Sequence, residues 1–274
     1  GERRIIHYPQ KRIIGLYVRR MNKNMIDNGI DFDFGKTSKE YAKFRDIYPK
    51  ELYQKLYEIG VGLEGSNWLD MGTGTGVIPR GMAQYGANII ATDISHNQIN
   101  EAIELSKGME NIKYKVIAAE DIDYEENTFD AITACQCFWY FDSKIVVPKI
   151  KRILRPGGIF LKVYMSYMKE EDITQDSNEI VKQINNSWEG ASPAIQDLKT
   201  HYFENPQMDT IIVDIPFTRE SWHGRMLASR GVMAAMNEKQ ISEFGKRHMD
   251  MLCKKYPKQF TVKHKVFLTW YTMK

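Results

Sequence analysis

The sequence predicts an α/β fold in which a doubly wound, mostly parallel sheet of seven strands carries helices on both faces. The first observation behind this prediction is that short apolar segments alternate with amphipathic ones over residues 66–164. Such alternation favours right-handed crossovers between parallel strands. The second observation is a glycine-rich turn directly after the first apolar segment. The third is a polar break at residues 165–204, which predicts a helical insertion that forms a lid.

Helical patterns precede the sheet. Thr37 or Ser38 can cap a helix on which Tyr41 and Arg45 lie one turn apart on the same face. Pro49 is well placed to open a second helix, because its missing N–H is not needed in a first helical turn. The apolar stripe of that second helix ends at Gly60, which predicts its end there.

The predicted strands are short apolar runs bounded by turn residues or polar clusters. In chain order they are Asn67–Met71, Asn88–Thr92, Ile112–Ala118, Phe129–Cys135, Ile159–Tyr164, Asp209–Ile215 and Thr261–Thr272. The helices predicted within the same stretch of chain are Val77–Tyr85, Asn97–Lys107, Ser143–Leu154, Arg219–Ala228 and Glu238–Tyr256. A turn is predicted before the fifth strand, at Arg155-Pro156-Gly157-Gly158.

Composition indicates a globular chain with a distinctive amino end. Of 274 residues, 43% are hydrophobic and 27% are charged, and the formal net charge of +3 argues against nucleic acid or a membrane as a partner. Residues 1–20 hold six Lys or Arg side chains and one acid, so residues 1–30 are predicted to be a basic extension. The other interpretation of this extension is an arm that contacts phosphate or an acidic partner. Residues 31–274 are predicted to form the main domain, with residues 205–274 completing the sheet.

The three cysteines indicate the compartment. Cys135, Cys137 and Cys253 form no CxxC pair and have no histidine at metal-ligand spacing. We therefore expect no metal site and no disulfide framework, and a reducing, cytoplasmic location. No run approaches the roughly 18 apolar residues that a transmembrane helix needs. Monomer and homodimer both remain open.

The first predicted strand runs into the turn Asp70-Met71-Gly72-Thr73-Gly74-Thr75-Gly76, at the position where open α/β sheets bind ligands. Glycines there let the backbone approach a ligand closely. Val77 takes the place of the third glycine of a dinucleotide fingerprint, and no Gly-Lys-Ser/Thr follows, so NAD and nucleoside triphosphates fit poorly. Asp93 ends the second strand, where a carboxylate can accept hydrogen bonds from both hydroxyls of a ribose.

On these residues the chain resembles the class I S-adenosylmethionine-dependent methyltransferases, especially the ubiquinone-biosynthesis-like and trans-aconitate-methyltransferase-like group. Residues 68–76 and 91–95 are similar to the first two motifs of that family. The resemblance implies a Rossmann-like fold and S-adenosylmethionine as cofactor, with S-adenosylhomocysteine as its product. It also implies methyl transfer to a small-molecule acceptor. Further similar segments are Tyr41–Pro49, Ala119–Ile122, Phe129–Ile132 and Leu154–Gly158.

The resemblance and the strand-end positions together give a set of expected cofactor-binding residues. Asp93 is expected to hold the ribose, Arg45 to pair with the carboxylate of the methionine part, and Gln98 to flank the adenine. For each residue the alternative is a structural role in a turn, a cap or a solvated surface. The full set is Tyr41, Arg45, Asp70, Gly72, Thr73, Gly74, Gly76, Asp93, Ile94, Gln98, Ala119, Glu120, Asp121 and Gln136.

Residues expected on the acceptor side come from two segments. Trp139 and Tyr140 follow the fourth strand, and Trp222 and Arg225 lie on one predicted helix. Aromatic faces suit a sulfonium cation, although such residues are commonly core packing. His223 and Tyr140 are the candidate catalytic residues, with His223 as a general base, although a lone histidine is more often structural.

Two other functions fit the same residues. RNA could be the acceptor if residues 1–20 bind phosphate. The chain could also bind the cofactor as a regulator, without transferring a methyl group. A nicotinamide-dependent oxidoreductase is disfavoured by the glycine spacing.

Overall fold

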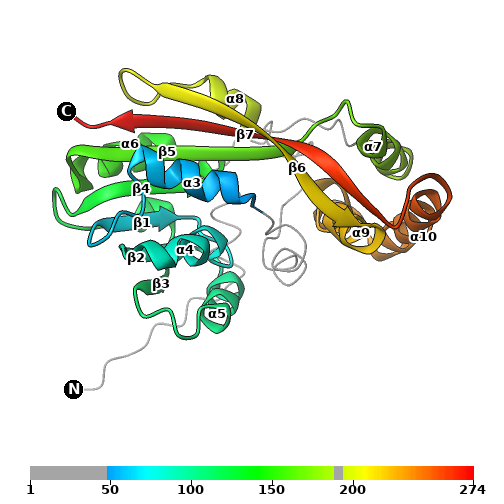
Figure 1. Cartoon of the computed structure of the whole chain (residues 1–274), viewed down its shortest axis with the longest axis horizontal. Helices are drawn as coiled ribbons and strands as arrows, with labels where there is room; N and C mark the ends of the chain where they lie inside the picture. The colour runs from blue at the N-terminus through cyan, green and yellow to red at the C-terminus, as the bar shows by residue number, and fades with distance from the viewer. Residues whose placement is uncertain (1–47, 188–193) are drawn as a thin grey trace.

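A computed structural model of the chain describes residues 48–187 and 194–274, and a seven-stranded sheet lies at its centre (Figure 1). The strands lie in the order β3-β2-β1-β4-β5-β7-β6. Strands β1 to β5 pair in parallel, whereas β7 is antiparallel to both β5 and β6. The predicted seven-stranded, mostly parallel, Rossmann-like sheet is therefore confirmed. The strands are β1 Asn67–Met71, β2 Asn88–Asp93, β3 Ile112–Val116, β4 Phe129–Cys135, β5 Leu154–Tyr167, β6 Gln207–Thr218 and β7 Gln259–Thr272.

Helices cover both faces of the sheet because successive side chains of a strand point to opposite sides. On β1, Trp68 belongs to the same buried cluster as Leu52 and Leu56 of α3, whereas Leu69 clusters with Val146 of α6. The helices are α3 Lys50–Ile59, α4 Val77–Met82, α5 His96–Leu105, α6 Ser143–Ile153, α7 Asp172–Ile184, α8 Ala194–Lys199, α9 Arg219–Leu227 and α10 Glu238–Lys255. Short helical turns are η4 Ala83–Tyr85, η5 Ala119–Asp121, η6 Phe138–Tyr140 and the π-helical η7 Arg230–Ala234.

Four of the helices begin where the sequence supplies a side chain that caps the free backbone amides. Ser95 caps α5 by accepting from the Gln98 amide, and Asp142 caps α6 by accepting from the Lys144 amide. Thr218 and Asn237 form capping boxes at the starts of α9 and α10. These caps explain why the predicted starts of these helices lie within one residue of the observed ones.

The start of β5 corrects one prediction. Arg155-Pro156-Gly157-Gly158 is not a turn that precedes the strand but an irregular part of it, since Phe129 pairs with Leu154 and Ala131 pairs with Ile159. The extra residues bulge out of the ladder with β4. Backbone bonds to β7 hold them, because Gly157 donates to the Met273 carbonyl at 2.8 Å and Met273 donates to the Gly158 carbonyl at 2.8 Å.

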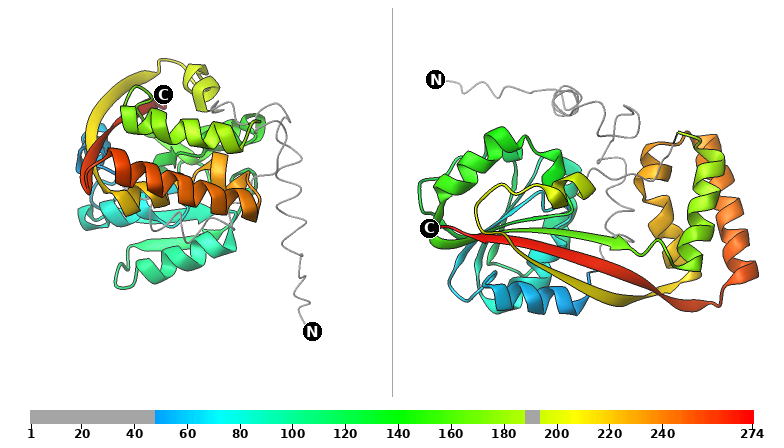
Figure 2. Two further views of the ribbon diagram at one scale, coloured as in Figure 1. Left: turned by 90° about the vertical axis from the view of Figure 1, so that its right-hand side faces the viewer. Right: turned by 90° about the horizontal axis from the view of Figure 1, so that it is seen from above.

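Helices α7, α9 and α10 pack together as a helical lobe beyond the carboxyl ends of the parallel strands (Figure 2). Strands β5, β6 and β7 extend out of the sheet to reach it, and they connect directly to α7, α9 and α10 respectively. The segment predicted to be a helical insertion thus contributes α7 to this lobe and α8 to a separate site beside η6. Its role as a lid stays a prediction.

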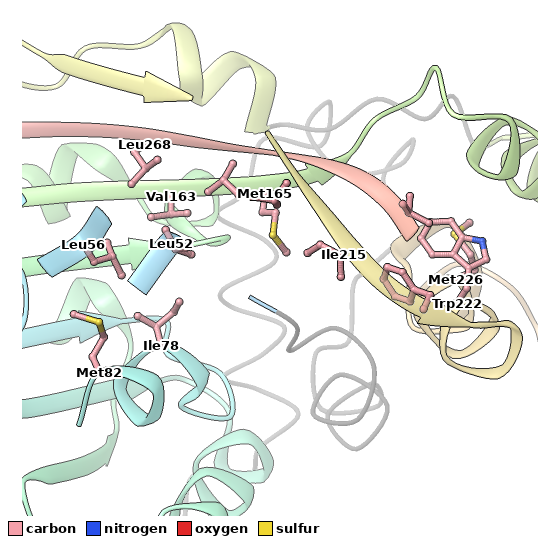
Figure 3. Close-up of a cluster of buried hydrophobic side chains, with 14 of the residues drawn as sticks. Leu52, Leu56, Ile78, Met82, Val163, Met165, Ile215, Trp222, Met226 and Leu268 are labelled. Atoms are coloured by element: carbon pink, nitrogen blue, oxygen red, sulfur yellow. The ribbon is translucent and has the colours of Figure 1, made fainter. Parts of the chain in front are cut away.

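One buried apolar cluster runs from the sheet into the lobe (Figure 3). It contains Leu56 and Met82 on one side of the sheet, continues through Met165 and Ile215 on the extended strands, and includes Trp222 of the lobe. Continuous apolar burial of this kind ties the lobe to the sheet. Over residues 48–187 and 194–274, no helix combines the length and apolar character that a membrane crossing requires.

Candidate functional site

The glycine turn after β1 is built from backbone that only glycine adopts easily, and two of its glycines are also enclosed by protein. Gly72 has φ +64°, and a Cβ there would lie 2.6 Å from Cys137 Sγ. A Cβ at Gly76, with φ +75°, would collide with the Tyr114 hydroxyl. Gly74 differs, because only the Gln98 side chain lies near its missing Cβ, at 3.7 Å. The middle of the turn therefore leaves room for a ligand against the backbone.

Asp93, at the end of β2, faces this turn. Its Oδ2 accepts from the Gly74 amide at 2.9 Å, and its Oδ1 accepts from the Ser95 amide at 2.9 Å. Burial raises the pKa of Asp93, while the donated amides of Ser95, Gly74 and Ile94 lower it. These bonds fix the orientation of the carboxylate, and each oxygen keeps a second lone pair that can accept a further hydrogen bond.

Asp70, by contrast, lies beneath the turn. It is wholly buried and accepts a 2.6 Å hydrogen bond from the Thr133 hydroxyl, which itself accepts from Trp68 Nε1 at 2.8 Å. Burial raises the pKa of Asp70 to about 6, a shift that the Thr133 bond opposes and the nearby Asp93 charge increases. Asp70 does not line the cleft that opens at this turn, so its expected contact with the cofactor stays a prediction.

A cleft of about 600 Å³ opens between the glycine turn and the carboxyl ends of β2 and β4. This volume lies within the range of small-molecule and cofactor sites. The structure brings together eight of the predicted site residues there, whereas Thr73 and Gly76 stay within the turn. The wall is formed by Gly72, Gly74, Asp93, Ile94, Gln98, Ile117, Ala119, Cys135, Gln136, Cys137, Tyr140 and Phe141.

Ile117 and Phe141 are wall residues that the sequence reasoning missed. Ile117 follows β3 directly, and Phe141 follows η6. The third strand was predicted to run to Ala118, which placed Ile117 inside it, and Phe141 stands beyond η6, several residues after the end of β4. Both side chains are apolar, and an apolar side chain carries no chemical signature in the sequence that marks it as a ligand contact.

Gln136 lines the cleft, and its own backbone has an uncommon conformation with φ +62°. Its side-chain amide pairs with the backbone of Met165 on β5, donating from Nε2 to the carbonyl at 2.7 Å and accepting at Oε1 from the amide at 2.8 Å. The amide is thus engaged by β5, and the expected contact of Gln136 with the cofactor stays a prediction.

Two thiols also line the cleft. Burial raises the pKa of Cys135 and of Cys137 well above the usual value, so both remain protonated. Cys137 donates to the Met71 carbonyl at 3.2 Å. Both cysteines are half-buried, and protonated thiols of this kind behave as small apolar groups and not as nucleophiles.

Residues expected around the adenine lie at different depths. Gln98 is buried, and its Oε1 has no hydrogen-bond partner within the described residues. Glu120 uses Oε1 to accept from the Asp142 amide at 2.7 Å, which ties η5 to the start of α6. Asp121 is exposed, and neither acid lines the cleft. Ala119 of the same turn does line it.

Tyr140 of η6 lines the cleft, whereas its neighbour Trp139 is not among the wall residues. Their rings are 5.3 Å apart, and Trp139 also meets Tyr164 of β5 edge-on at 5.6 Å. Tyr164 in turn stacks on Phe267 at 5.9 Å. An aromatic surface therefore continues from the cleft across β5 to β7.

The candidates on α9 lie away from this cleft. Trp222 is wholly buried and donates to Ser177 Oγ at 3.0 Å, so its side chain has no surface to offer an acceptor. His223 Nδ1 lies 2.8 Å from His248 Nδ1 of α10, inside the lobe, and burial lowers the pKa of His223. Arg225 lies over the Tyr167 ring at 5.4 Å. The structure thus gives these three residues packing partners within or beside the lobe and no place in the cleft wall.

Two expected cofactor residues, Tyr41 and Arg45, lie outside the described residues. Within the described ranges, no group of three His, Cys, Asp or Glu side chains could hold a metal ion.

Residues 69–161, which include every wall residue of the cleft, match a family model described as a methyltransferase domain. A protein named as a methyltransferase in Dictyostelium discoideum is 31% identical over 128 residues, which cover 47% of each chain. A ubiquinone biosynthesis O-methyltransferase of Alkalilimnicola ehrlichii is 33% identical over 122 residues, covering 43% of this chain and 49% of the relative. The chain therefore matches about half the length of these curated relatives.

Among solved structures, a protein of Anaeromyxobacter dehalogenans described as a type II methyltransferase aligns with a TM-score of 0.59. The alignment covers 83% of this chain and 96% of that one at 17% identity, so it shows the fold alone. The matched domain, the relatives and the sheet order agree with the resemblance seen in the motifs. Through residues 69–161, the chain is similar to the methyltransferase domains of these proteins.

Proposed function

We propose that this protein transfers a methyl group from S-adenosylmethionine to a small-molecule acceptor. The observation that carries the proposal is the Asp93 carboxylate, held by the Gly74 and Ser95 amides at the wall of a cleft whose glycine turn lies open at Gly74. A carboxylate at this strand end suits the two hydroxyls of a ribose. The family match supports the same cofactor.

The described residues fit an adenosyl ligand in three respects. Gly74 leaves space at the turn. Gln98 offers a buried oxygen that lacks a partner among the described residues, and a bound ligand that donates a hydrogen bond would satisfy it. Burial raises the pKa of Asp70 and the Asp93 charge adds to that shift, so a cation near these two carboxylates would be favoured.

S-adenosylmethionine would supply an electrophilic methyl group on a sulfonium. The work left to the chain is then to orient the acceptor and to exclude water. Tyr140 and Phe141 close one side of the cleft, and Trp139 carries the aromatic surface outward to Tyr164. This surface supports an acceptor with an apolar or aromatic part. RNA as acceptor would depend on residues 1–20, which lie outside the described ranges.

The test is calorimetric titration of S-adenosylhomocysteine into the full chain and into Asp93→Ala. We expect the variant to bind at least about 30-fold more weakly, because two charge-assisted hydrogen bonds to the ribose are lost. The matched control is Asp123→Ala, which removes an exposed carboxylate that is bound to Arg152 and does not line the cleft. Equal affinity in all three proteins would show that Asp93 does not hold the ribose of the cofactor.

Methyl transfer itself is checked by following the radiolabelled methyl group of S-adenosylmethionine into a panel of phenols, thiols and amines. Turnover of one class above the background without protein supports the proposal and names the acceptor atom. Tight cofactor binding with no turnover on any class would favour a regulator instead.

A further inference from the structure

Lys162 places an ammonium group in the middle of the sheet. It lies on β5 between Leu161 and Val163, opposite Ala134 of β4 and Thr269 of β7, and is 4% exposed. A buried ammonium is costly unless it is paired and hydrogen-bonded. The partner must therefore be found within the protein.

That partner is Asp197 of α8, which is 7% exposed. Lys162 Nζ donates to Asp197 Oδ2 at 2.9 Å and to the Asp197 carbonyl at 3.0 Å. The Tyr202 hydroxyl donates to Asp197 Oδ1 at 2.7 Å, so both carboxylate oxygens are used. Burial lowers the pKa of Lys162, and the Asp197 charge opposes that shift.

The same ammonium touches the turn that closes the cofactor cleft. Nζ lies 4.6 Å from the centre of the Tyr202 ring and 5.4 Å from that of Phe138, the first residue of η6. The Phe138 ring meets Tyr202 edge-on at 5.0 Å and Phe141 at 5.6 Å. Phe141 is a wall residue of the cleft, close to Gly72 and Cys137.

A buried ion pair is poor evidence for stability, because well-packed apolar residues of similar size often do as well or better. The hydrogen bonds of this pair are directional, so they fix α8 in one position over η6. We propose that the Lys162–Asp197 pair is a positioning device that docks α8 against η6 and thereby holds Phe141 and Cys137 in the wall of the cleft. The consequence for cofactor affinity rests on the proposed function.

The test uses three variants in a Cys135→Ala, Cys253→Ala background, which leaves Cys137 as the remaining thiol of the chain. They are Lys162→Met, Asp197→Asn and the double variant, which carries no buried charge at either position. Three quantities are measured under native conditions: the rate at which 5,5′-dithiobis(2-nitrobenzoate) labels Cys137, the free energy of unfolding in urea, and the affinity for S-adenosylhomocysteine.

We expect the single variants to be destabilised and the double variant to recover most of the wild-type stability. In the double variant Cys137 should still be labelled about tenfold faster than in the parent, and S-adenosylhomocysteine should bind about tenfold more weakly, because α8 is no longer fixed over η6. The control is Lys263→Met, which removes an exposed ion pair with Asp214 and should change neither the labelling rate of Cys137 nor the affinity for S-adenosylhomocysteine.

Labelling that stays at the parent rate, or rises only in proportion to global unfolding, would show that the pair is merely structural and would overturn the inference. Labelling does not involve the cofactor. If the parent protein failed to bind S-adenosylhomocysteine, the proposed function would fall while the thiol measurement still decided the role of the pair.

Discussion

Acidification should destabilise the protein through His248, a histidine that the lobe holds in its neutral form. Ser177 Oγ donates to the Ile173 carbonyl at 2.6 Å and accepts from Trp222, so His248 Nε2, at 2.9 Å, must be the donor to Ser177. His248 Nδ1 then accepts from His223 Nδ1. This assignment, made from the hydrogen-bond pattern, leaves no site for a second proton on His248.

The size of the effect follows from the pKa values. Burial lowers the pKa of His248 to about 3, against about 6.5 for an unfolded histidine. A depressed pKa in the folded state means that the unfolded chain binds more protons below pH 6.5, so stability is fully present above that pH and is lost as the pH falls. At about 1.4 kcal/mol per pH unit, moving from pH 6.5 to pH 5 costs about 2 kcal/mol.

The assay is urea unfolding of the wild type and of His248→Asn at several pH values between 5 and 7.5. Other groups also titrate here: burial lowers the pKa of His264 to about 4 and raises that of Asp70 to about 6. Because both proteins contain these two groups, the difference between them reports on His248 together with its partner His223, whose pKa burial also lowers. The stability deficit of the variant should shrink by about 2 kcal/mol from pH 7.5 to pH 5. A deficit that does not change with pH would refute the assignment.

Two substitutions test the site itself. Gly76→Ala should cost about 2–4 kcal/mol of unfolding free energy, because it adds a clash with Tyr114 to the strain of a positive φ. Gly108→Ala, with φ +87° and open space around it, should cost only about 1 kcal/mol; equal losses in urea would contradict the clash. Thr133→Val removes the hydroxyl between Asp70 and Trp68 and should cost about 1–3 kcal/mol. The Thr133 hydroxyl lowers the pKa of Asp70, which is about 6, so it stabilises the ionised carboxylate. The loss of unfolding free energy should therefore be larger at pH 8, where Asp70 is ionised, than at pH 5. A loss that is independent of pH would argue against that hydrogen bond.

Local patterns predicted the parts of the fold that local interactions decide. The bounds of β1 and β4 agree with the prediction, because apolar runs there stop at a glycine turn or at polar residues. The start of β5 was wrong because Arg155-Pro156-Gly157-Gly158 has the composition of a turn, whereas its backbone is held by Met273, more than a hundred residues further along the chain. Such pairing leaves no local trace.

The site residues show the same contrast between local patterns, which the sequence displays, and long-range packing, which it does not. Asp93 and Gly74 could be found from their positions after strands, and they meet in the structure. Trp222 was expected on the acceptor side, yet its indole is buried against Ser177, a packing partner that depends on how α7 and α9 meet. Lys162 interrupts an apolar run, which is a visible signal, but its partner Asp197 lies on another element and could not be identified before the fold was known.

The backbone ladder that leads into the lobe has a mechanical consequence. Pairing between β5 and β7 continues without a break from Ile159 to Tyr167. Pairing between β6 and β7 continues to Thr218, the residue that immediately precedes α9. Turning the lobe relative to the part of the sheet that carries the cleft would require these ladders to bend or to lose hydrogen bonds. We therefore expect substrate selection to depend on the side chains and short connections at the strand ends, and not on a hinge between two rigid halves.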